Sequence, residues 1–331
     1  MKNHLLCCDW GTTSFRLRLV NIQDQEIIGE ILSLDGISST FNAWKVLENK
    51  ELDKQTFFTN HLKKQIWLLA KQLNMVLNEI AIVVSGMASS SIGLFEVPYA
   101  ALPFDLEGTQ VNLYRIEANA DFPHDLLLIS GICSEYDVMR GEETQMIGLA
   151  ELLKLSEKDS ILIFPGTHSK HLYVKGNQLV DFQTYMTGEV FKIISSHSIL
   201  KDSIEISVLP ELTLEEKSAF RLGVQNADSA GILKGLFRVR TNQLFNKLNK
   251  KENAFYLSGL LIGSEIKHLL DEINMQLVLC SGNNLYELYK LAMEELNLSD
   301  LTITVSSDIV DKATVAGQVK IYQNQTFNID R

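Results

Sequence analysis

The chain has 331 residues, of which 46% are hydrophobic and 5 are prolines, and its formal net charge at pH 7 is −11. This length allows two domains that each bury a core, and the composition is that of a compact globular protein rather than a disordered one. An acidic chain without a basic stripe is not expected to bind nucleic acid, and without an apolar run of about 18 residues it is not expected to cross a membrane.

A hairpin of two strands is the first element that the sequence predicts. An apolar run at 5–8 leads into Asp9, Gly11, Thr12 and Thr13, and a run that alternates apolar and basic side chains begins at residue 15. Glycine lets the backbone come close to a ligand, and hydroxyl-bearing residues supply N–H and O–H donors that suit phosphate oxygens. Asp9 could hold Mg²⁺ directly or through water, because hard cations prefer carboxylate oxygen. The alternative is an ordinary turn.

A third strand, a helical region and a buried strand are expected next. A turn at 21–25 and a strand at 26–34 follow the hairpin, and 42–77 is mainly helical, because apolar residues recur there at helical spacing. A buried strand at 79–84 ends in Ser85, Gly86 and Met87. A loop rich in serine and glycine follows these residues.

Charged residues crowd the junction between a strand at 125–130 and a helix at 142–153. They are Asp137, Arg140, Glu142 and Glu143. A phosphotransferase that acts on an alcohol needs a carboxylate to accept or orient the hydroxyl proton, and a positive charge to hold an anionic substrate. Glu142 is the first choice for this base, Asp137 is the second, and Arg140 is the candidate for a substrate carboxylate. The alternative is helix capping together with a surface ion pair.

The second half of the chain repeats the order of the first hairpin. A strand at 160–164 leads into Gly166, Thr167, His168 and Ser169, a second strand follows, and a turn at 175–178 precedes a third strand. Two such units predict a duplicated domain with a nucleotide held between its halves. Neither a P-loop nor a Rossmann motif is present. The expected fold class is α/β, with two ribonuclease-H-like (actin-like ATPase) domains and an interdomain nucleotide cleft.

Strands and helices alternate through the rest of the chain, which requires a buried sheet covered by helices. Helices are expected at 186–200, 213–245, 255–270, 285–296 and 308–322, and strands at 276–280 and 301–305. Gly282 stands between a strand and a helix, where it could admit a base and ribose, although a plain turn has the same pattern. Gly259 and Gly263, four apart on a helix, indicate close helix packing rather than a ligand contact.

Four cysteines lie in apolar runs without C-x-x-C spacing: Cys7, Cys8, Cys133 and Cys280. They are expected to be buried free thiols, which fits a reducing cytosol, and the start of the chain lacks the apolar core of a signal peptide. We therefore expect a cytoplasmic protein. Zinc is not expected, because His168 and His171, three apart on a strand, would point to opposite faces.

Six motifs together resemble the 2-dehydro-3-deoxygalactonokinase family. They are D-W-G-T-T-S-F-R at 9–16, S-G-M at 85–87, E-V-P-Y at 96–99, D-V-M-R-G-E-E-T-Q at 137–145, P-G-T-H-S-K at 165–170 and M-T-G-E at 186–189. The resemblance implies an actin-like, two-domain kinase that uses ATP and Mg²⁺ to phosphorylate the 6-hydroxyl of 2-dehydro-3-deoxy-D-galactonate. It also implies that the sugar acid contacts Ser85, Met87, Glu96, Tyr99 and Arg140.

The expected domains are an N-terminal ATPase domain at 1–122 and a C-terminal ATPase domain at 123–308. A final helix at about 309–331 is expected to pack back on the first domain. Apolar edges such as Ile31 and Leu32 could support a homodimer.

Two departures from the family pattern leave the substrate open. The pattern has an arginine and a tryptophan ahead of E-x-P-Y, where this chain has Ser91 and Leu94. If that arginine contacts the acid group, this chain binds a different or less charged sugar. A kinase of the same fold for another sugar acid or a neutral sugar is therefore the competing hypothesis, and a non-catalytic ATP-binding regulator is the third.

Overall fold

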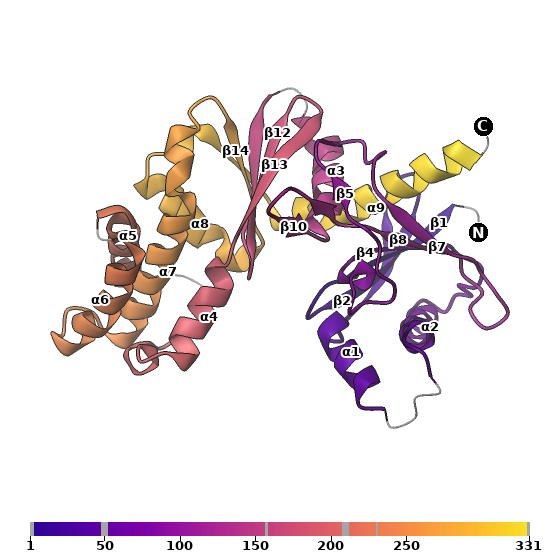
Figure 1. Cartoon of the computed structure of the whole chain (residues 1–331), viewed down its shortest axis with the longest axis horizontal. Coiled ribbons are helices and arrows are strands. Elements are labelled where there is room, and N and C mark those ends of the chain that lie inside the picture. Colours follow the sequence, from indigo (N-terminus) through magenta and orange to yellow (C-terminus); the bar gives the residue numbers. More distant parts are fainter. Residues whose placement is uncertain (1–2, 48–51, 156–157, 207–211, 230, 330–331) are drawn as a thin grey trace. The chain divides into compact units, whose positions relative to one another are not determined.

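The computed structural model describes residues 3–47, 52–155, 158–206, 212–229 and 231–329. The chain groups into two compact units. The first consists of Met1–Glu157, Lys175–Asp181 and Asp308–Arg331, and the second of Lys158–Val174 and Phe182–Ser307. Each unit contains a mixed sheet and several helices (Figure 1). The α/β class expected from the sequence is confirmed.

The sheet of the first unit has the strand order β3-β2-β1-β4-β8-β7. Its strands are β1 (His4–Trp10), β2 (Phe15–Asn21), β3 (Ile27–Ser33), β4 (Ile82–Gly86), β7 (Leu113–Ile116) and β8 (Leu126–Ile129). β1, β4 and β8 are parallel, whereas β2, β3 and β7 run antiparallel to their neighbours. β1 and β4 are apolar along most of their length because they lie in the middle of the sheet, where both faces are covered.

The sheet of the second unit repeats this topology. Besides the short strand β6 (Phe104–Asp105), which pairs with the start of β13, it has five strands in the order β15-β14-β11-β12-β13. They are β11 (Ser160–Phe164), β12 (Ser169–Lys175), β13 (Gln178–Tyr185), β14 (Gln276–Cys280) and β15 (Thr302–Val305). β11, β14 and β15 are parallel, and β12 is antiparallel to β11. The order matches β8-β4-β1-β2-β3, which confirms the duplication that the two hairpins predicted.

Residues 126–129 and the final helix both belong to the first unit. The expected domains placed residue 123 onward in the second half, but β8 is hydrogen-bonded to β4. The helix α9 (Ser307–Ile329) crosses α3 (Glu142–Leu153) closely, since a Cβ added to Gly148 would lie 1.8 Å from the carbonyl oxygen of Ala313. The division at residue 122 stays a prediction.

The remaining helices begin and end at local signals. They are α1 (Ile37–Lys45), α2 (Lys54–Leu73), α4 (Thr187–His197), α5 (Leu214–Ser229), α6 (Ile232–Leu244), α7 (Lys250–Ile266) and α8 (Asn283–Glu295). The expected helix at 213–245 is two helices, and Gly231, with φ +68°, precedes the second. α7 begins earlier than expected because Asn249 and Glu252 form a capping box at its start.

Short elements that the sequence analysis did not predict complete the fold. They are the strands β5 (Ala100–Ala101), β6 (Phe104–Asp105), β9 (Ile132–Cys133) and β10 (Val138–Met139), and the 3₁₀ helices Met87–Ser89, Lys201–Ser203, Lys267–Asp271 and Ser299–Leu301. β10, β9 and β5 form a small sheet of their own. It positions the segment that leads into α3.

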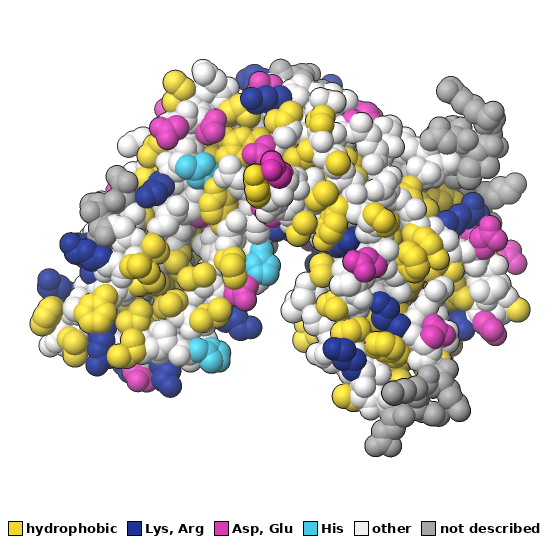
Figure 2. Space-filling model, viewed as in Figure 1, with side chains coloured by type: hydrophobic (Ala, Val, Ile, Leu, Met, Phe, Trp, Pro, Cys, Tyr) yellow, Lys and Arg dark blue, Asp and Glu magenta, His cyan; other side chains and the backbone are white. Residues whose placement is uncertain are grey.

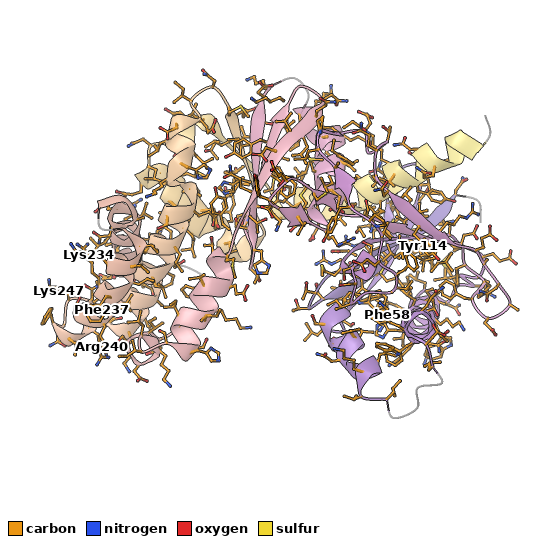
Figure 3. The ribbon with its side chains drawn as sticks, in the orientation of Figure 1. Phe58, Tyr114, Lys234, Phe237, Arg240 and Lys247 are labelled. Carbon is orange, nitrogen blue, oxygen red and sulfur yellow. The ribbon has the colours of Figure 1, made fainter. Side chains whose placement is uncertain are left out.

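Each unit has its own core. In the first unit Trp10 packs edge-on against Phe15, with ring centroids 5.1 Å apart, and against the fully buried Phe58 (Figure 3). In the second unit α7 crosses α5 at very short range, because a Cβ added to Gly259 would lie 2.0 Å from the carbonyl oxygen of Phe220. This contact confirms that Gly259 serves helix packing.

The cysteines are free thiols, as expected. Cys7, Cys8 and Cys280 are buried, and burial raises the pKa of the Cys8 thiol well above its usual value. Cys133 is only half-buried, because it lies on the two-residue strand β9 rather than in a central strand. The expectation of burial was therefore wrong for Cys133.

The surface of the second unit exposes apolar and basic side chains on α6. Leu233 is 81% and Phe237 is 58% exposed, and Figure 2 shows hydrophobic and basic side chains mixed over this part of the unit. Lys234, Arg240 and Lys247 lie along α6 and the segment after it (Figure 3). Within the described part of the chain, no helix combines the length and apolar character that a membrane span requires.

Candidate active site

The loop between β1 and β2 caps the helix α1. The backbone N–H of Ile37 donates to the carbonyl oxygen of Gly11 at 2.9 Å, and the N–H of Ser38 donates to that of Thr12 at 3.1 Å. A Cβ added to Gly36 would lie 2.5 Å from the Thr12 carbonyl oxygen, so only glycine fits there. Thr12 and Thr13 are exposed. The first N–H groups of the helix thus bind carbonyl oxygens of the loop, and the threonine side chains remain exposed to solvent.

The loop between β11 and β12 caps α4 in the same way. The N–H of Glu189 donates to the carbonyl oxygen of Thr167 at 3.0 Å. A Cβ added to Gly188 would lie 2.6 Å from the carbonyl oxygen of Gly166. His168 is exposed, and its Nε2 lies 2.5 Å from a carboxylate oxygen of Glu189. Each of the two predicted loops is therefore in contact with the first turn of the helix that follows the third strand of its unit.

Asp9 lies near the carboxyl end of β1, beside Gly86 at the end of β4. Gly86 has φ +84°, and a Cβ there would lie 3.5 Å from Oδ1 of Asp9. Burial raises the pKa of the Asp9 carboxyl, although Arg16 and Arg18 act in the opposite direction. Among the described residues, none donates a hydrogen bond to this carboxylate. A half-buried carboxylate without donors suits a cation.

The start of α3 adjoins Gly86. Gly141 has φ +111°, and a Cβ added to it would lie 3.5 Å from the Cα of Gly86. Glu142 is the first residue of the helix, so this contact brings it to the strand end that carries Asp9. Asp137 lies before β10, and its Oδ1 accepts the N–H of Val138 at 2.7 Å. Glu142 is thus the residue directly after the close contact between Gly141 and Gly86.

Glu143 has a structural position beneath Glu142. It is 1% exposed, and its Oε2 accepts the N–H of Gly141 at 2.7 Å. Burial, together with the neighbouring charge of Glu142, raises the pKa of Glu143 to about 8. Glu143 therefore braces the glycine turn from which the helix begins.

Ser85 is held by the C-terminal helix. Nε2 of Gln318 on α9 donates to the carbonyl oxygen of Cys8 at 2.8 Å and to Oγ of Ser85 at 2.9 Å. Gln318 and Ser85 are both buried. This one amide ties the ends of β1 and β4 together, so the Ser85 hydroxyl is occupied in this structure.

Arg140 holds the segment that contains the other expected substrate residues. Its guanidinium donates to Oγ of Ser89 at 2.8 Å and to the carbonyl oxygen of Val97 at 3.0 Å. It also lies 4.0 Å from the ring centroid of Tyr99, and its buried Nε has no partner. Arg140 and Tyr99 are therefore in contact with each other.

The expected residues around this segment differ in exposure. Glu96 is exposed and Met87 is half-buried at the start of its 3₁₀ helix. Leu94 is 2% exposed and lies in the core, so it does not face a ligand. Ser91 is exposed, and Nζ of Lys54 donates to its carbonyl oxygen at 2.8 Å. A lysine side chain thus contacts Ser91, the position at which the family pattern has an arginine.

Gly282 follows β14, the strand adjacent to β11. It is exposed, and a Cβ added there would meet no atom within 4 Å. Ser281 beside it is buried, and its hydroxyl donates to the carbonyl oxygen of Gly282 at 3.0 Å. The open space at Gly282 is compatible with an adenosine group.

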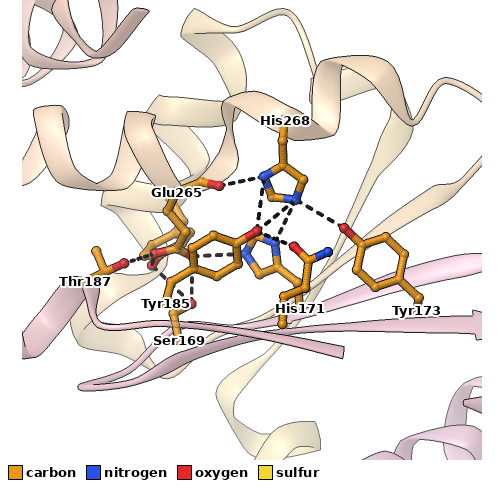
Figure 4. A network of polar contacts seen from close by, with 9 residues as sticks. Ser169, His171, Tyr173, Tyr185, Thr187, Glu265 and His268 are labelled. Atoms are coloured by element: carbon orange, nitrogen blue, oxygen red, sulfur yellow. Dashed lines mark hydrogen bonds and ion pairs between the residues drawn. The ribbon is translucent and has the colours of Figure 1, made fainter. Parts of the chain in front are cut away.

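A buried carboxylate that the sequence analysis missed lies beneath the second loop. Glu265 on α7 accepts hydrogen bonds from Ser169, Thr187 and Tyr289, and pairs with His171 (Figure 4). Gly36 and Gln318 were also missed. Gly36 had a signal, because a glycine directly before a helix is a common cap, but Glu265 and Gln318 are single polar residues within helices and gave none.

Comparison with known proteins identifies relatives over most of the chain. A family model described as 2-keto-3-deoxy-galactonokinase matches residues 9–321. A 2-dehydro-3-deoxygalactonokinase of Escherichia coli is 31% identical over 65% of this chain and 70% of its own length. A protein of Rhizobium meliloti named as a probable 2-dehydro-3-deoxygalactonokinase is 28% identical over 88% of this chain and 89% of its own.

Solved structures share the fold. A crystal structure from Sinorhizobium meliloti, to which the name 2-dehydro-3-deoxygalactonokinase is provisionally assigned, is 28% identical with a TM-score of 0.74 and 95% of each chain covered. An activator of 2-hydroxyisocaproyl-CoA dehydratase from Clostridium difficile is 11% identical with a TM-score of 0.50, covering 99% of this chain and 98% of its own. The second likeness concerns the fold alone, and it agrees with the predicted actin-like ATPase class.

Proposed function

We propose a reaction for this chain from one premise: the chain belongs to the 2-keto-3-deoxy-galactonokinase family. It is accordingly a kinase, a phosphotransferase with an alcohol group as acceptor, and its substrate is a sugar acid. The proposal is that ATP is the donor, used with Mg²⁺, and that the acceptor is the 6-hydroxyl of 2-dehydro-3-deoxy-D-galactonate. The names of the two relatives support this choice of substrate.

The observation that carries the proposal is the repeated loop. In both units a glycine and hydroxyl-bearing loop follows the first strand and has carbonyl oxygens bound by the next helix. We propose that Gly11, Thr12 and Thr13 bind phosphate oxygens of the nucleotide. Gly166, Thr167 and His168 form the second such loop, Ser169 supports it through its buried hydroxyl, and Gly282 borders the adenosine. Loops fixed by helices can orient phosphates without a reorganisation cost during the reaction.

Asp9 is the proposed magnesium ligand. Its carboxylate is half-buried without donors, and Mg²⁺ commonly binds through one or two carboxylates together with phosphate oxygens and water. The ion supplies positive charge to the transferring phosphoryl group. Asp9 holds this charge at the end of β1, directly beside the first loop.

Glu142 is the proposed base, with Asp137 as the alternative. In the proposed step the 6-hydroxyl oxygen bonds to the γ-phosphorus, the bond from this phosphorus to the bridging oxygen breaks, and ADP leaves. The hydroxyl proton passes to the carboxylate. The contact between Gly141 and Gly86 supports Glu142, because it brings the first residue of α3 toward Asp9.

Positive charge around the segment 87–99 supports a sugar acid rather than a neutral sugar. Arg140 contacts this segment through Ser89 and Val97, and Lys54 contacts it through Ser91. We propose that these two cations attract the substrate carboxylate, while Met87, Glu96 and Tyr99 contact its hydroxyl groups or its carbon chain. Leu94, which stands where the family pattern has a tryptophan, is buried, so we propose that this difference does not affect substrate choice.

A homodimer is a further part of the proposal. β3 is the edge strand of the first sheet, and Leu32 on it is 60% exposed. An exposed apolar edge of this kind can pair with a second copy. Sedimentation of the purified chain tests it, since a monomer at micromolar concentration contradicts the proposal.

The test of the function is ADP release from the purified chain with ATP and Mg²⁺. The assay is run with 2-dehydro-3-deoxy-D-galactonate, with D-galactonate, with D-galactose and without any sugar. Stimulation by the first acid alone supports the proposal. Stimulation by D-galactonate or D-galactose instead would point to the competing substrate hypotheses. ATP binding without any stimulated turnover would favour the non-catalytic regulator.

A further inference from the structure

We propose that Glu265 is a positioning residue that holds the second phosphate-binding loop, residues 166–168, in its working conformation. The inference rests on the proposed function in one respect, which is that this loop binds nucleotide phosphates. Glu265 itself lies on α7 and is 2% exposed. It acts through Ser169, which follows the loop, and through Thr187 at the start of α4, and not through the residues that we assign to phosphate contact.

Four side chains converge on the Glu265 carboxylate (Figure 4). Ser169 donates to Oε1 at 2.6 Å, and Nε2 of His171 lies 3.0 Å from the same oxygen. Thr187 and Tyr289 donate to Oε2, the latter at 2.8 Å. Both oxygens are thus fully occupied by donors, which is the condition under which a buried charge is tolerated.

One of these donors follows the loop directly in the chain, and a second adjoins the residues of α4 that contact it. Ser169 is the residue after His168, so its bond fixes the point where the loop enters β12. Thr187 precedes Gly188 and Glu189, and these two residues contact the backbone of Gly166 and Thr167. Glu265 therefore connects the end of the loop with the helix on which the loop rests.

The hydrogen bonds also decide the charge of Glu265. Burial alone would raise the pKa of this carboxyl, but the bonds from His171, Ser169 and Thr187 outweigh it and lower the pKa below its usual value. Glu265 is therefore ionised at neutral pH. A glutamine in its place would carry an NH₂ group toward one set of donors, and a donor cannot accept their bonds.

A second layer of side chains fixes His171. Nδ1 of His268 lies 2.8 Å from the carbonyl oxygen of Glu265, which can only accept, so this nitrogen carries the proton. Nε2 of His268 is then an acceptor, and the hydroxyl of Tyr173 lies 3.2 Å from it. The rings of His171 and His268 stack with centroids 5.2 Å apart. Burial and the neighbouring His171 lower the pKa of His268, which agrees with a neutral ring.

Close packing of α7 holds Glu265 in a rigid position. Among the described residues, the first loop has no comparable anchor. A Cβ added to Gly263 would lie 2.9 Å from the Cα of Val224, so the backbone just before Glu265 is pressed against α5. In the first loop the serine at the corresponding position, Ser14, is exposed, whereas Ser169 is completely buried. The duplicated loops therefore differ in this anchor, since the serine of the second loop is buried and bound to Glu265 and the serine of the first is exposed.

The test compares Glu265→Gln with the wild-type chain in kinetics and in nucleotide binding. We expect the KM for ATP and the dissociation constant of ADP to rise about tenfold or more, because charge-assisted bonds to the loop are lost. The KM for the sugar acid should change less than about threefold, since its proposed contacts lie elsewhere. A merely structural role would reduce the active fraction, and hence kcat, without changing the KM for ATP.

Glu216→Gln is the matched control. Glu216 is also a glutamate of the second unit, 4% exposed on α5, and it accepts the N–H of Thr213 at 2.9 Å. Glu216 has no hydrogen bond to the second loop among the described residues. The KM of the Glu216→Gln variant for ATP should therefore remain within about twofold of wild type. Thr187→Val should reproduce part of the Glu265→Gln effect, and Thr187→Ser should restore wild-type values because it keeps the donor.

Hydrogen exchange separates this inference from the proposed function. The amides of residues 166–169 and 187–190 should exchange about tenfold faster in Glu265→Gln than in Glu216→Gln, whether or not the chain turns over the sugar acid. Faster exchange without any kinase activity would support the positioning role and overturn the reaction proposed above. Unchanged exchange in these segments, or an unchanged KM for ATP in an active variant, would overturn the positioning role.

Discussion

Gly36 and Gly188 both lie against the loop between the first two strands of their unit. Each stands at the start of the helix that follows the third strand. A Cβ would come within 2.5 Å of the Thr12 carbonyl oxygen at Gly36 and within 2.6 Å of the Gly166 carbonyl oxygen at Gly188. The repeated contact shows that the duplication includes the support of the loops as well as the strands.

Gly36→Ala should therefore displace the first loop. The added methyl group meets backbone atoms that cannot rotate away, and a shift of about 1 Å at a binding group can reduce a rate by about 100-fold. We expect the KM for ATP to rise at least about tenfold in steady-state kinetics. Gly235→Ala is the control, because its methyl group meets only the end of the flexible Leu260 side chain. Equal KM values for the two variants would contradict the assigned role of Gly36.

Asp9→Asn should abolish most of the turnover while the fold is kept. The amide has nearly the shape of the carboxylate but lacks the charge that a cation requires, so we expect kcat to fall about 100-fold or more. Asp24→Asn is the control, because Asp24 lies in the exposed turn between β2 and β3, at the opposite end of the strands from the first loop. This variant should leave kcat unchanged. The measurement is ADP release as a function of Mg²⁺ concentration. A variant that keeps wild-type turnover would exclude Asp9 as the metal ligand.

Arg140→Lys should weaken binding of the sugar acid. A lysine cannot make both bonds of the guanidinium, to Ser89 and to Val97, while it stacks on Tyr99. We expect the KM for the sugar acid to rise about tenfold, with the KM for ATP nearly unchanged. Arg115→Lys serves as the control, since Arg115 forms an exposed ion pair with Asp125. An increase confined to the KM for ATP would assign Arg140 to the nucleotide instead.

Glu143 should make the first unit less stable as the pH rises. Its pKa is about 8 in the folded chain and 4.5 in an ordinary environment, so between these values the folded state binds more protons than the unfolded state. The free energy of unfolding must then fall as the pH increases through this window. Glu143→Gln removes the titration, and urea unfolding at pH 5 and pH 9 should show the variant gaining stability relative to wild type at the higher pH. A constant difference between the two proteins would contradict the raised pKa.

Local patterns in the sequence were sufficient for the strands of the two hairpins and for the duplication. Residues 5–8 and 160–164 are apolar runs followed by glycine and hydroxyl residues, and such patterns depend on neighbours within a few positions. The loops, the strand at 276–280 and the helix packing through Gly259 were predicted on that basis. Boundaries were less accurate where a cap decides them, as at Asn249 before α7.

The sequence by itself determined the order of the strands along the chain, the two loops and the residue types that could bind a nucleotide and a sugar acid. Only the tertiary structure decided which polar residues support those loops, because their partners are far away in the chain. Gln318 reaches Cys8 and Ser85, Glu265 reaches Ser169, and Leu94 enters the core although it stands just ahead of a motif. A single polar side chain in a helix looks the same in sequence whether it faces water or a buried donor. Its role becomes visible only when folding removes water and requires each buried hydrogen-bonding group to find a partner.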